Sequence, residues 1–482
     1  MDDWISYRCE VRRILHMSQE EKEQFQAKIE RLDQRGSGQA VVWRENEKGN
    51  PKKLKLVVPQ TIPGEEVLVD ALYPTKKWSK TELKEVMDAS PERTIAPCPH
   101  FDICGGCVWQ HWEYSGQLKH KTEYVKKAIE SQGFEPELVK PTIGMDRPWD
   151  YRNKMEFTFS PEGNMGMHEQ GNFKNVFDLE TCLIASDDMV NASLEVSEWA
   201  KDHGLKGYEK EEHTGLLRHL MVRQSFTTGE IMLALIATQS PNGELEEAVN
   251  DLINRISKFT KVKSLMWLEN TLWADRVDAE AIHVLAGRDF IYDEIYGYRY
   301  RLWYDTFFQT NPTQAKKLID LALEVGQPKE HETMIDLFCG VGTFSLPFAS
   351  RVKRLAGVEI VESSIESAKR NAVENGIDNT YFIAQDARRG IDHVLEEFGQ
   401  PDILLLDPPR SGAGGKVMRR IGRSKPKRIV YVSCNPSSFA EDVAELKPFN
   451  YELKSVQPVD LFPHTVHVEL VAEIVLTNEE ES

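Results

Sequence analysis

The sequence predicts a multidomain protein that ends in an α/β domain, with a sheet of parallel strands between two layers of helices. Three observations lead to this fold class: a length of 482 residues, short β-rich runs near the N-terminus, and regular β-α-β alternation in the last third. A chain of this length exceeds what one hydrophobic core supports, so two or three domains are expected.

Residues 27–90 predict a small β-barrel. The runs AVVW, LKLVVP and EEVLVDALY are separated by the turn signals Arg35–Gly38, Gly49–Pro51 and Pro63–Gly64, a spacing typical of small barrels. Residues 1–26 form an N-terminal extension, and residues 91–300 mix helical and strand patterns without a repeat. The middle of the chain is therefore expected to be an α+β domain.

Residues 301–482 carry the α/β pattern. TMIDLF, RLAGVEI, TYFIAQD, DILLLDPP and RIVYVSC are strands, TFSLPFAS opens a helix, and VESSIESAKRNAVENG is a helix ending at Gly376. Such alternation indicates a parallel sheet covered on both faces, and ligands bind such sheets beyond the carboxyl ends of the strands. One crevice should therefore collect the residues that follow these strands: Asp336, Glu359, Asp386, Asp407 and Cys434.

The motif DLFCGVGTFS predicts a nucleotide-like site. It places Gly340 and Gly342 in a strand-to-helix turn, where missing side chains let a ligand approach the backbone. Glu359 ends the next strand, where a carboxylate accepts hydrogen bonds from ribose hydroxyls, and Asp386 follows the third strand, in reach of an adenine edge. Ser345 replaces the third glycine of dinucleotide motifs, which favours S-adenosylmethionine over a nicotinamide cofactor.

The motif LLLDPPRSG indicates which atom is methylated. Enzymes that methylate amino groups of nucleic acids usually carry an aromatic residue after Asp-Pro-Pro, whereas Arg410 stands here. A ring carbon is then the target to consider, and C5 of uracil becomes nucleophilic only after a thiolate adds to C6. Cys434 ends a strand just before Asn435-Pro436 and fits that role better than a core position. Because free thiols titrate near about pH 8.5, the site must lower the pKa or supply a base.

A base must also remove the C5 proton after methyl transfer. Glu469 is an acid within the alternating run PHTVHVELVAEIVL, and Glu473 and His467 are alternatives in the same run. An acid in a strand is more often a solvent-facing residue, so both interpretations stay open at this point. Cys339 lies inside the glycine turn and is expected only to pack there.

The cysteines predict a metal site. Cys98, Cys104 and Cys107 form a C-x5-C-x2-C pattern, Cys182 stands apart, and Cys9 lies in the extension. In a reducing compartment such cysteines indicate metal binding before disulfides. Four thiolates suit tetrahedral zinc or an iron-sulfur cluster.

The net charge of −18 argues against a nucleic-acid partner, because Lys and Arg dominate phosphate binding. The segment Lys416–Arg428, however, holds no acid, and it is either a solvated face or a phosphate-binding surface. The chain contains neither a signal-peptide core nor a long apolar run. We therefore expect a cytoplasmic protein that makes no membrane contact and acts as a monomer.

Five motifs resemble those of the RNA (uracil-5-)-methyltransferase family in order: FFQTN, DLFCGVGTFSL, LLLDPPRSG, VSCNPSS and HVELV. The resemblance implies a Rossmann-like methyltransferase domain at the C-terminus, a central domain, and an OB-like TRAM barrel that binds RNA. It also implies that Cys434 is the nucleophile and Glu469 the general base. The implied S-adenosylmethionine contacts are Gln309, Phe338, Glu359 and Asp407, with Thr343 standing where a relative has Asn.

The same resemblance favours a [4Fe-4S] cluster at Cys98, Cys104, Cys107 and Cys182. It predicts an S-adenosylmethionine-dependent enzyme that forms 5-methyluridine in RNA, with 23S rRNA favoured because tRNA enzymes of this family typically lack the TRAM barrel. Two alternatives are methylation of tRNA and an iron-sulfur RNA-binding protein with a vestigial methyltransferase fold.

Overall fold

The computed structural model describes residues 23–45, 49–72, 78–273 and 279–477. The chain forms two compact units. The first consists of Met1–Pro97, Cys107–Gln117 and His464–Val466, and the second of Cys98–Gly106, Leu118–Pro463 and His467–Ser482. Residues 1–22 of the predicted extension 1–26 lie outside the described residues.

The first unit is built on one six-stranded sheet in the order β1-β5-β6-β4-β3-β2. Its strands are β1 (Glu23–Lys28), β2 (Arg31–Leu32), β3 (Gly38–Glu45), β4 (Pro51–Val58), β5 (Glu66–Ala71) and β6 (Ser79–Asp88). In β5, Val67, Val69 and Ala71 alternate into the core while their neighbours face outward. Strand β1 begins before the predicted boundary at residue 27. The prediction missed its start because the polar residues of β1 give no apolar signal. The barrel itself stays a prediction.

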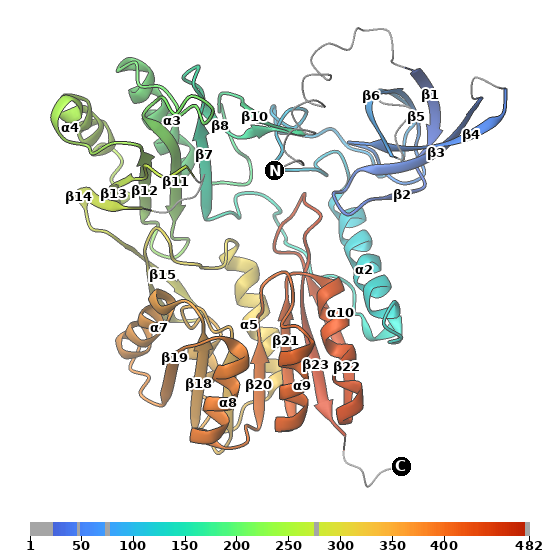
Figure 1. Ribbon diagram of the computed structural model, residues 1–482, viewed down its shortest axis with the longest axis vertical. Helices are drawn as coiled ribbons and strands as arrows, with labels where there is room; N and C mark the ends of the chain where they lie inside the picture. Colours follow the sequence, from blue (N-terminus) through green and yellow to red (C-terminus); the bar gives the residue numbers. More distant parts are fainter. Residues whose placement is uncertain (1–22, 46–48, 73–77, 274–278, 478–482) are drawn as a thin grey trace, which may run out of the picture. The chain divides into compact units, whose positions relative to one another are not determined.

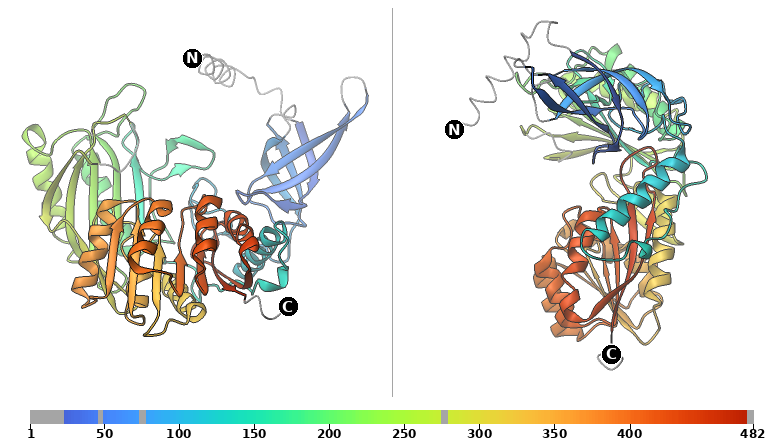
Figure 2. Two further views of the ribbon diagram at one scale, coloured as in Figure 1. Left: turned by 60° about the horizontal axis from the view of Figure 1, so that its bottom comes forward. Right: turned by 90° about the vertical axis from the view of Figure 1, so that its right-hand side faces the viewer.

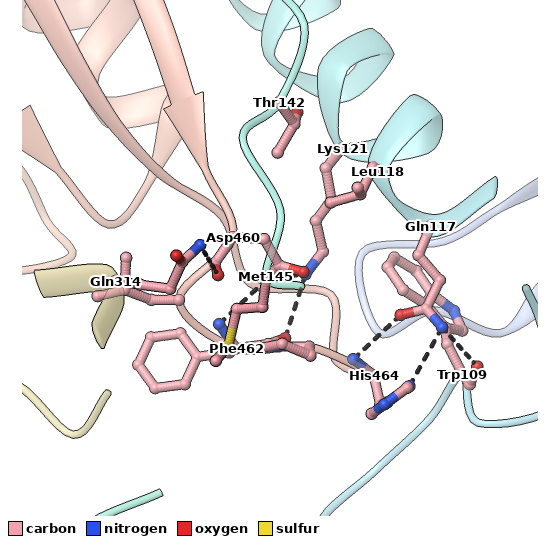
Figure 3. A network of polar contacts seen from close by, with 12 residues as sticks. Trp109, Gln117, Leu118, Lys121, Thr142, Met145, Gln314, Asp460, Phe462 and His464 are labelled. Carbon is pink, nitrogen blue, oxygen red and sulfur yellow. Dashed lines mark hydrogen bonds and ion pairs between the residues drawn. The ribbon is translucent and has the colours of Figure 1, made fainter. Parts of the chain in front are cut away.

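Segments far apart in sequence complete the first unit. Trp109 is buried, and its indole Nε1 donates to the carbonyl of Gly36 over 3.1 Å. Gln117 donates to the carbonyl of Trp109 over 3.0 Å and accepts from the backbone N–H of His464 over 3.0 Å (Figure 3). The short stretch after Pro463 therefore belongs to the N-terminal core rather than to the sheet that surrounds it in sequence.

A second six-stranded sheet opens the second unit, in the order β14-β13-β12-β11-β7-β8. Its strands and the nearby hairpin strands are β7 (Lys154–Phe159), β8 (Met165–Gly166), β9 (His168–Glu169), β10 (Asn172–Val176), β11 (Leu217–Gln224), β12 (Ile231–Ala237), β13 (Val262–Glu269) and β14 (Ala281–Gly287). Helices α3 (Asp187–Asp202) and α4 (Glu246–Ile256) pack on it. Trp199 and Trp267 fill this core, so residues 91–300 contain the α+β structure that was predicted.

A seven-stranded sheet forms the rest of the second unit, in the order β19-β18-β17-β20-β21-β23-β22 (Figure 1). Its strands are β17 (Thr333–Leu337), β18 (Arg354–Glu359), β19 (Thr380–Ala384), β20 (Ile403–Leu406), β21 (Arg428–Ser433), β22 (Tyr451–Val459) and β23 (Glu469–Leu476). Five strands run parallel as predicted, but β23 is antiparallel to both of its neighbours. The sheet is therefore mixed, because β23 follows β22 through a return loop rather than a crossover helix.

Helices cover both faces of this sheet, as Figure 2 shows from the side. On one face lie α5 (Pro312–Gly326), α6 (Ser345–Ala349) and α7 (Glu362–Glu374). On the other lie α8 (Ala387–Phe398), α9 (Gly415–Ser424) and α10 (Pro436–Ala444), with residues of α2 (Tyr114–Glu130). The hairpin of β15 (Ile291–Ile295) and β16 (Tyr298–Leu302) joins the two sheets in sequence. Short 3-10 turns lie at Pro136–Leu138, Gly243–Leu245 and Lys447–Phe449.

Among the described residues, no helix is long and apolar enough to cross a membrane.

Candidate active site

The register of the parallel strands aligns the predicted cofactor residues. Leu337 of β17 pairs with β18 on one side and with β20 on the other. The residues that follow on these three strands, Phe338, Glu359 and Asp407, therefore stand close to one level at the carboxyl edge of the sheet. This is the edge at which ligands bind in such folds, so the predicted convergence of these residues is consistent with the structure.

The glycine turn has a backbone that few side chains tolerate. Phe338, Gly340 and Gly342 have φ values of 68°, 52° and 89°, all in the left-handed region that favours glycine. The Glu359 carboxylate accepts from the N–H of Gly340 over 3.3 Å and from the N–H of Ile360 over 2.8 Å. Backbone donors of the turn and just after β18 thus hold the Glu359 carboxylate, and an added Cβ at Gly340 would meet no atom within 4 Å.

Asp336 lies beneath the turn. Ser345 donates its hydroxyl to Asp336 Oδ2 over 2.5 Å, while Oδ1 is buried with no hydrogen-bond partner among the described residues. Burial raises the pKa of Asp336 to about 8. The sequence showed only that Ser345 is not a third glycine; in the structure its hydroxyl is the partner that a buried carboxyl requires.

Three predicted cofactor residues remain: Asp386, Gln309 and Thr343. Asp386 is exposed and caps α8 by accepting from the N–H of Arg388 over 3.1 Å. Gln309 is half-buried, and its carbonyl accepts from Asn153 over 3.1 Å. Thr343 is half-buried in the glycine turn. Their contacts with a cofactor stay predictions.

The predicted nucleophile and base meet at the other end of the same edge. Ser433, the last residue of β21, pairs with Leu470 of β23. Because these strands are antiparallel, the next rung brings Cys434 beside Glu469. Asn435 caps α10 by accepting from the N–H of Ser437 over 3.2 Å, and Pro436 is the first helical residue. The strand therefore stops at the cysteine because a helix starts there.

The environment of Cys434 does not lower its pKa. Burial, then the charges of Glu469 and Asp407, raise the pKa of the thiol to about 11, against a lowering effect of Arg410. The position just before a helix N-terminus favours a thiolate, but desolvation outweighs it here. The sequence left open two ways to form the thiolate, a lowered pKa or a base. Because the pKa of Cys434 is raised, a base is required.

Glu469 is buried, with only 7% of its surface exposed. Burial, then Asp407, raise its pKa to about 8, and Arg410 opposes them. The solvent-facing interpretation is therefore wrong for this acid. Glu473 lies further along β23, is half-buried and pairs with Ser455 of β22, so it is distant along the strand from the edge that holds Cys434.

Arg410 links the two motifs that follow β20 and β21. Its carbonyl accepts from Asn435 Nδ2 over 2.8 Å and from Ser438 Oγ over 3.1 Å. Its guanidinium lies 2.6 Å from His467 Nδ1, and arginine only donates. Burial and Arg410 lower the pKa of His467 to about 4. This imidazole is thus neutral with Nδ1 already engaged, which disfavours His467 as the base.

A buried ion pair holds the loop that leads to β23 (Figure 3). Lys121 Nζ lies 2.6 Å from Asp460 Oδ1 and donates to the carbonyl of Phe462 over 3.1 Å. Asn311 donates to the carbonyl of Leu461 over 2.8 Å. Lys121 and Asp460 are fully buried and 339 positions apart. Sequence reasoning missed this pair because no local pattern signals it.

The predicted cysteine site is not supported. Within the described residues, no group of three or more His, Cys, Asp or Glu is arranged to hold a metal ion. Cys98, Cys104 and Cys182 belong to the second unit and Cys107 to the first. Burial raises the pKa of Cys182, with a further contribution from the charge of Cys98, so these two thiols lie near each other, but they do not make a ligand set. The methyl-transfer chemistry requires no step through a cluster.

The acid-free segment Lys416–Arg428 is largely neutralised by acids from other elements. Arg419 pairs with Glu445 over 2.6 Å, and Arg420 pairs with Asp392 over 2.9 Å. The remaining pairs of this segment are Lys427 with Asp402 and Arg428 with Glu332. The sequence pattern therefore overstated the positive charge of this surface, because the compensating acids are distant in sequence.

Comparisons with known proteins agree with this geometry. The family model described as tRNA (Uracil-5-)-methyltransferase matches residues 113–477. A protein of Halalkalibacterium halodurans, named an RNA methyltransferase, is 38% identical over 428 residues, or 88% of this chain and 92% of its own length. Another so named, from Caldanaerobacter subterraneus, is 35% identical over 451 residues, or 92% of this chain and 97% of its own.

A solved structure is similar over almost the whole chain. It is the Pyrococcus abyssi tRNA (uracil-54, C5)-methyltransferase in complex with S-adenosyl-L-homocysteine, with a TM-score of 0.74 and 27% identity, covering 94% of this chain and 100% of that one. With a family match that spans most of the second unit, the chain belongs to the RNA (uracil-5-)-methyltransferase family.

Proposed function

We propose that this protein uses S-adenosylmethionine to form 5-methyluridine in a structured RNA through a covalent adduct with Cys434. The observation that carries the proposal is the meeting of Cys434 and Glu469 at the ends of β21 and β23, on the same sheet edge as the glycine turn. The division into a barrel at 27–90, a central domain at 91–300 and a methyltransferase domain at 301–482 belongs to the same proposal.

The glycine turn and its neighbours would hold the cofactor. Glu359 would bind the ribose hydroxyls in place of its present backbone donors, and Phe338 stands between Glu359 and Asp407 in the register. The other proposed contacts are Gln309, Gly340, Gly342, Thr343 and Asp386. When bound, S-adenosylmethionine supplies an electrophilic methyl group.

The protein's own residues perform the other steps. Cys434 passes its proton to solvent water and its sulfur bonds to C6 of the uracil, which moves electron density to C5 and makes that carbon nucleophilic. Once C5 carries the methyl group, ionised Glu469 takes the C5 proton, and the bond between sulfur and C6 breaks to release the thiolate. Arg410 lowers the pKa of both groups and thereby favours the charged form that each step needs.

Two RNA substrates compete within this proposal. 23S rRNA is favoured because tRNA enzymes of the family typically lack the N-terminal domain. The Pyrococcus abyssi enzyme, named for tRNA, nevertheless covers 94% of this chain, so this segment does not separate the two substrates. 23S rRNA stays the first substrate to test and tRNA the second. Nucleoside mapping of both RNAs from a deletion strain distinguishes them.

The decisive experiment compares Glu469→Gln with Cys434→Ala. Glu469→Gln keeps the shape and loses the base, so it should methylate once and then stall as a denaturation-resistant protein–RNA complex labelled through the methyl group. Cys434→Ala should bind RNA and cofactor, form no such complex and make no 5-methyluridine. Cys339→Ala, a buried cysteine in the glycine turn, controls for loss of a thiol. A Cys434→Ala protein that still makes 5-methyluridine overturns the mechanism.

The predicted [4Fe-4S] cluster is tested separately, since the proposed reaction makes no use of it. Protein purified without oxygen should hold about four irons per chain if Cys98, Cys104, Cys107 and Cys182 bind the cluster. Zinc in one-to-one ratio, or no metal, rejects it. Either result leaves the methyl-transfer proposal intact.

A further inference from the structure

The hairpin of β15 and β16 has two contrasting faces. One face is buried: Asp293, Ile295 and Tyr300 point into the core, and Tyr300 lies 3.5 Å from the carbonyls of Gly342 and Thr343. The other face carries Tyr292, Glu294, Arg299 and Arg301 at alternate positions. The period of two residues thus places the outer face directly opposite the face that supports the cofactor turn.

The outer face forms a continuous row of guanidinium groups and aromatic rings, which we call the arginine–aromatic row. Arg299 lies 3.5 Å from the centre of the Tyr292 ring, and Tyr292 lies 5.1 Å from Phe290. Phe290 lies 6.0 Å from Trp303, and Arg370 of α7 lies 5.0 Å from Trp303. All three rings are partly exposed.

The charges along the row are not equivalent. Arg288 pairs with Glu230, and Arg301 pairs with Glu374 over 2.5 Å. No carboxylate pairs with Arg299 or Arg370 within the part of the chain that the structure describes, and both are exposed. Arg299 rests on the Tyr292 ring although Glu294 stands opposite it in the strand pair. The two ends of the row therefore offer positive charge to a ligand.

The row is also held rigidly. Asn375, the C-cap residue of α7, accepts from the N–H of Arg299 over 2.8 Å and donates to its carbonyl over 2.7 Å. Asn371 accepts from the N–H of Arg301 over 3.2 Å. These bonds fix the free edge of β16 to α7, so that the cost of ordering the surface on binding is small.

We propose that the arginine–aromatic row binds a single-stranded segment of the RNA substrate, with Arg299 and Arg370 on phosphates and the partly exposed rings against bases. Cationic groups interleaved with aromatic rings are the chemistry that binds single-stranded RNA. The acid-free segment Lys416–Arg428, by contrast, is mostly paired with acids. This inference rests on the proposed function, because it needs RNA as the substrate.

The test compares two charge-matched variants of the full-length protein. Arg299→Gln/Arg370→Gln removes the free charges of the row, and Lys416→Gln/Arg423→Gln removes two exposed charges of α9. The probe is a short fluorescently labelled single-stranded RNA, titrated by anisotropy at several KCl concentrations. We expect the row variant to bind several-fold more weakly, with a salt slope shallower by about 0.7 for each phosphate that is no longer neutralised. The α9 variant should change neither quantity.

Two further measurements separate the outcomes. Unchanged affinity for S-adenosylhomocysteine shows that the row variant is folded, and Trp303→Phe should remove an RNA-induced quenching of tryptophan fluorescence. If the wild type binds and methylates RNA while the row variant keeps its affinity and slope, the inference fails and the proposed function stands. If the wild type binds no RNA, both fail. If polyglutamate displaces the labelled RNA as well as unlabelled RNA does, the row binds an acidic protein and the inference is overturned.

Discussion

The two ends of the carboxyl edge of the seven-stranded sheet are built in different ways. At the end that we propose holds the cofactor, called the cofactor end, Gly340 and Gly342 shape a local turn, and Glu359 is held by backbone N–H groups. At the end that we propose holds the substrate, called the substrate end, Cys434 and Glu469 are brought together by the pairing of β21 with β23, and both have raised pKa values. The first end depends on short-range conformation and the second on long-range contacts.

This difference indicates which substitutions should affect each end. A local turn is specified by residues that are neighbours in sequence, so one glycine decides whether it forms. The register of β23 depends on the loop after β22, which Lys121 and Asn311 hold from distant elements through Asp460 and the carbonyl of Leu461. Substitutions far from Cys434 should therefore affect the substrate end more than the cofactor end.

The largest effect is expected from Lys121→Met. The substitution leaves the Asp460 carboxylate buried without its cation, and breaking such a pair costs about 3–5 kcal/mol. Urea unfolding measures this loss, and adduct formation should fall more than affinity for S-adenosylhomocysteine. Lys126→Met on the same helix removes an exposed pair with Glu123 and should cost less than about 1 kcal/mol. Equal losses in the two variants would contradict the anchoring role.

The pH dependence of stability should reveal Glu469. Its pKa is raised from 4.5 to about 8, so the native state binds the proton more tightly than the unfolded state. The stabilisation is complete below pH 4.5 and is lost as the pH rises through 8. Unfolding free energies of wild type and Glu469→Gln should therefore diverge at a slope of up to about 1.4 kcal/mol per pH unit, in favour of Gln at high pH.

A pH-independent difference between these two proteins would show that Glu469 is not desolvated in solution. Asp336 and Asp407 also have raised pKa values, of about 8 and about 7, and both are present in wild type and variant. The contribution of Asp336 cancels in the difference, whereas that of Asp407 changes with the charge of Glu469 and is part of the difference.

A smaller effect is expected at the cofactor end from Gly342→Ala. A side chain at φ 89° costs about 1–2 kcal/mol. The added Cβ would lie 3.7 Å from Leu346, so relief of the strain would move the backbone of the turn. Gly163 has φ 98° with no atom within 4 Å of an added Cβ, so Gly163→Ala should cost a similar amount of stability. Calorimetry with S-adenosylhomocysteine should show weaker binding for Gly342→Ala alone; the same affinity in both would remove the turn from the cofactor site.

The smallest effect is expected from Asn435→Ala, which removes the cap of α10 and a bond to the carbonyl of Arg410. Loss of an N-cap costs about 1 kcal/mol. Ser186→Ala, which removes the cap of α3, should cost about the same. Only Asn435→Ala should slow adduct formation, because it alone frees the loop next to Cys434. If the rate of adduct formation falls equally in both variants, the effect of Asn435→Ala comes from lost stability alone.

The elements of the last third could be predicted because their signals are local. Five parallel strands and the end of α7 near Gly376 follow from short apolar runs and turn residues. The antiparallel direction of β23 and the polar strands β1 and β6 could not, because strand direction and pairing depend on partners distant in sequence. The charge of the basic segment on α9 could not be predicted for the same reason, since Glu445 and Asp392 lie outside it.

By itself, the sequence determined the α/β fold class, the glycine turn, and the positions of Cys434 and Glu469 at or near strand ends, because periodicity and turn chemistry act between neighbours in the chain. Only the tertiary structure decided that Glu469 is buried beside Cys434, that Arg410 faces both, and that Lys121 supports their loop. Burial and charge depend on which distant residues exclude water from a site, and no local pattern records that.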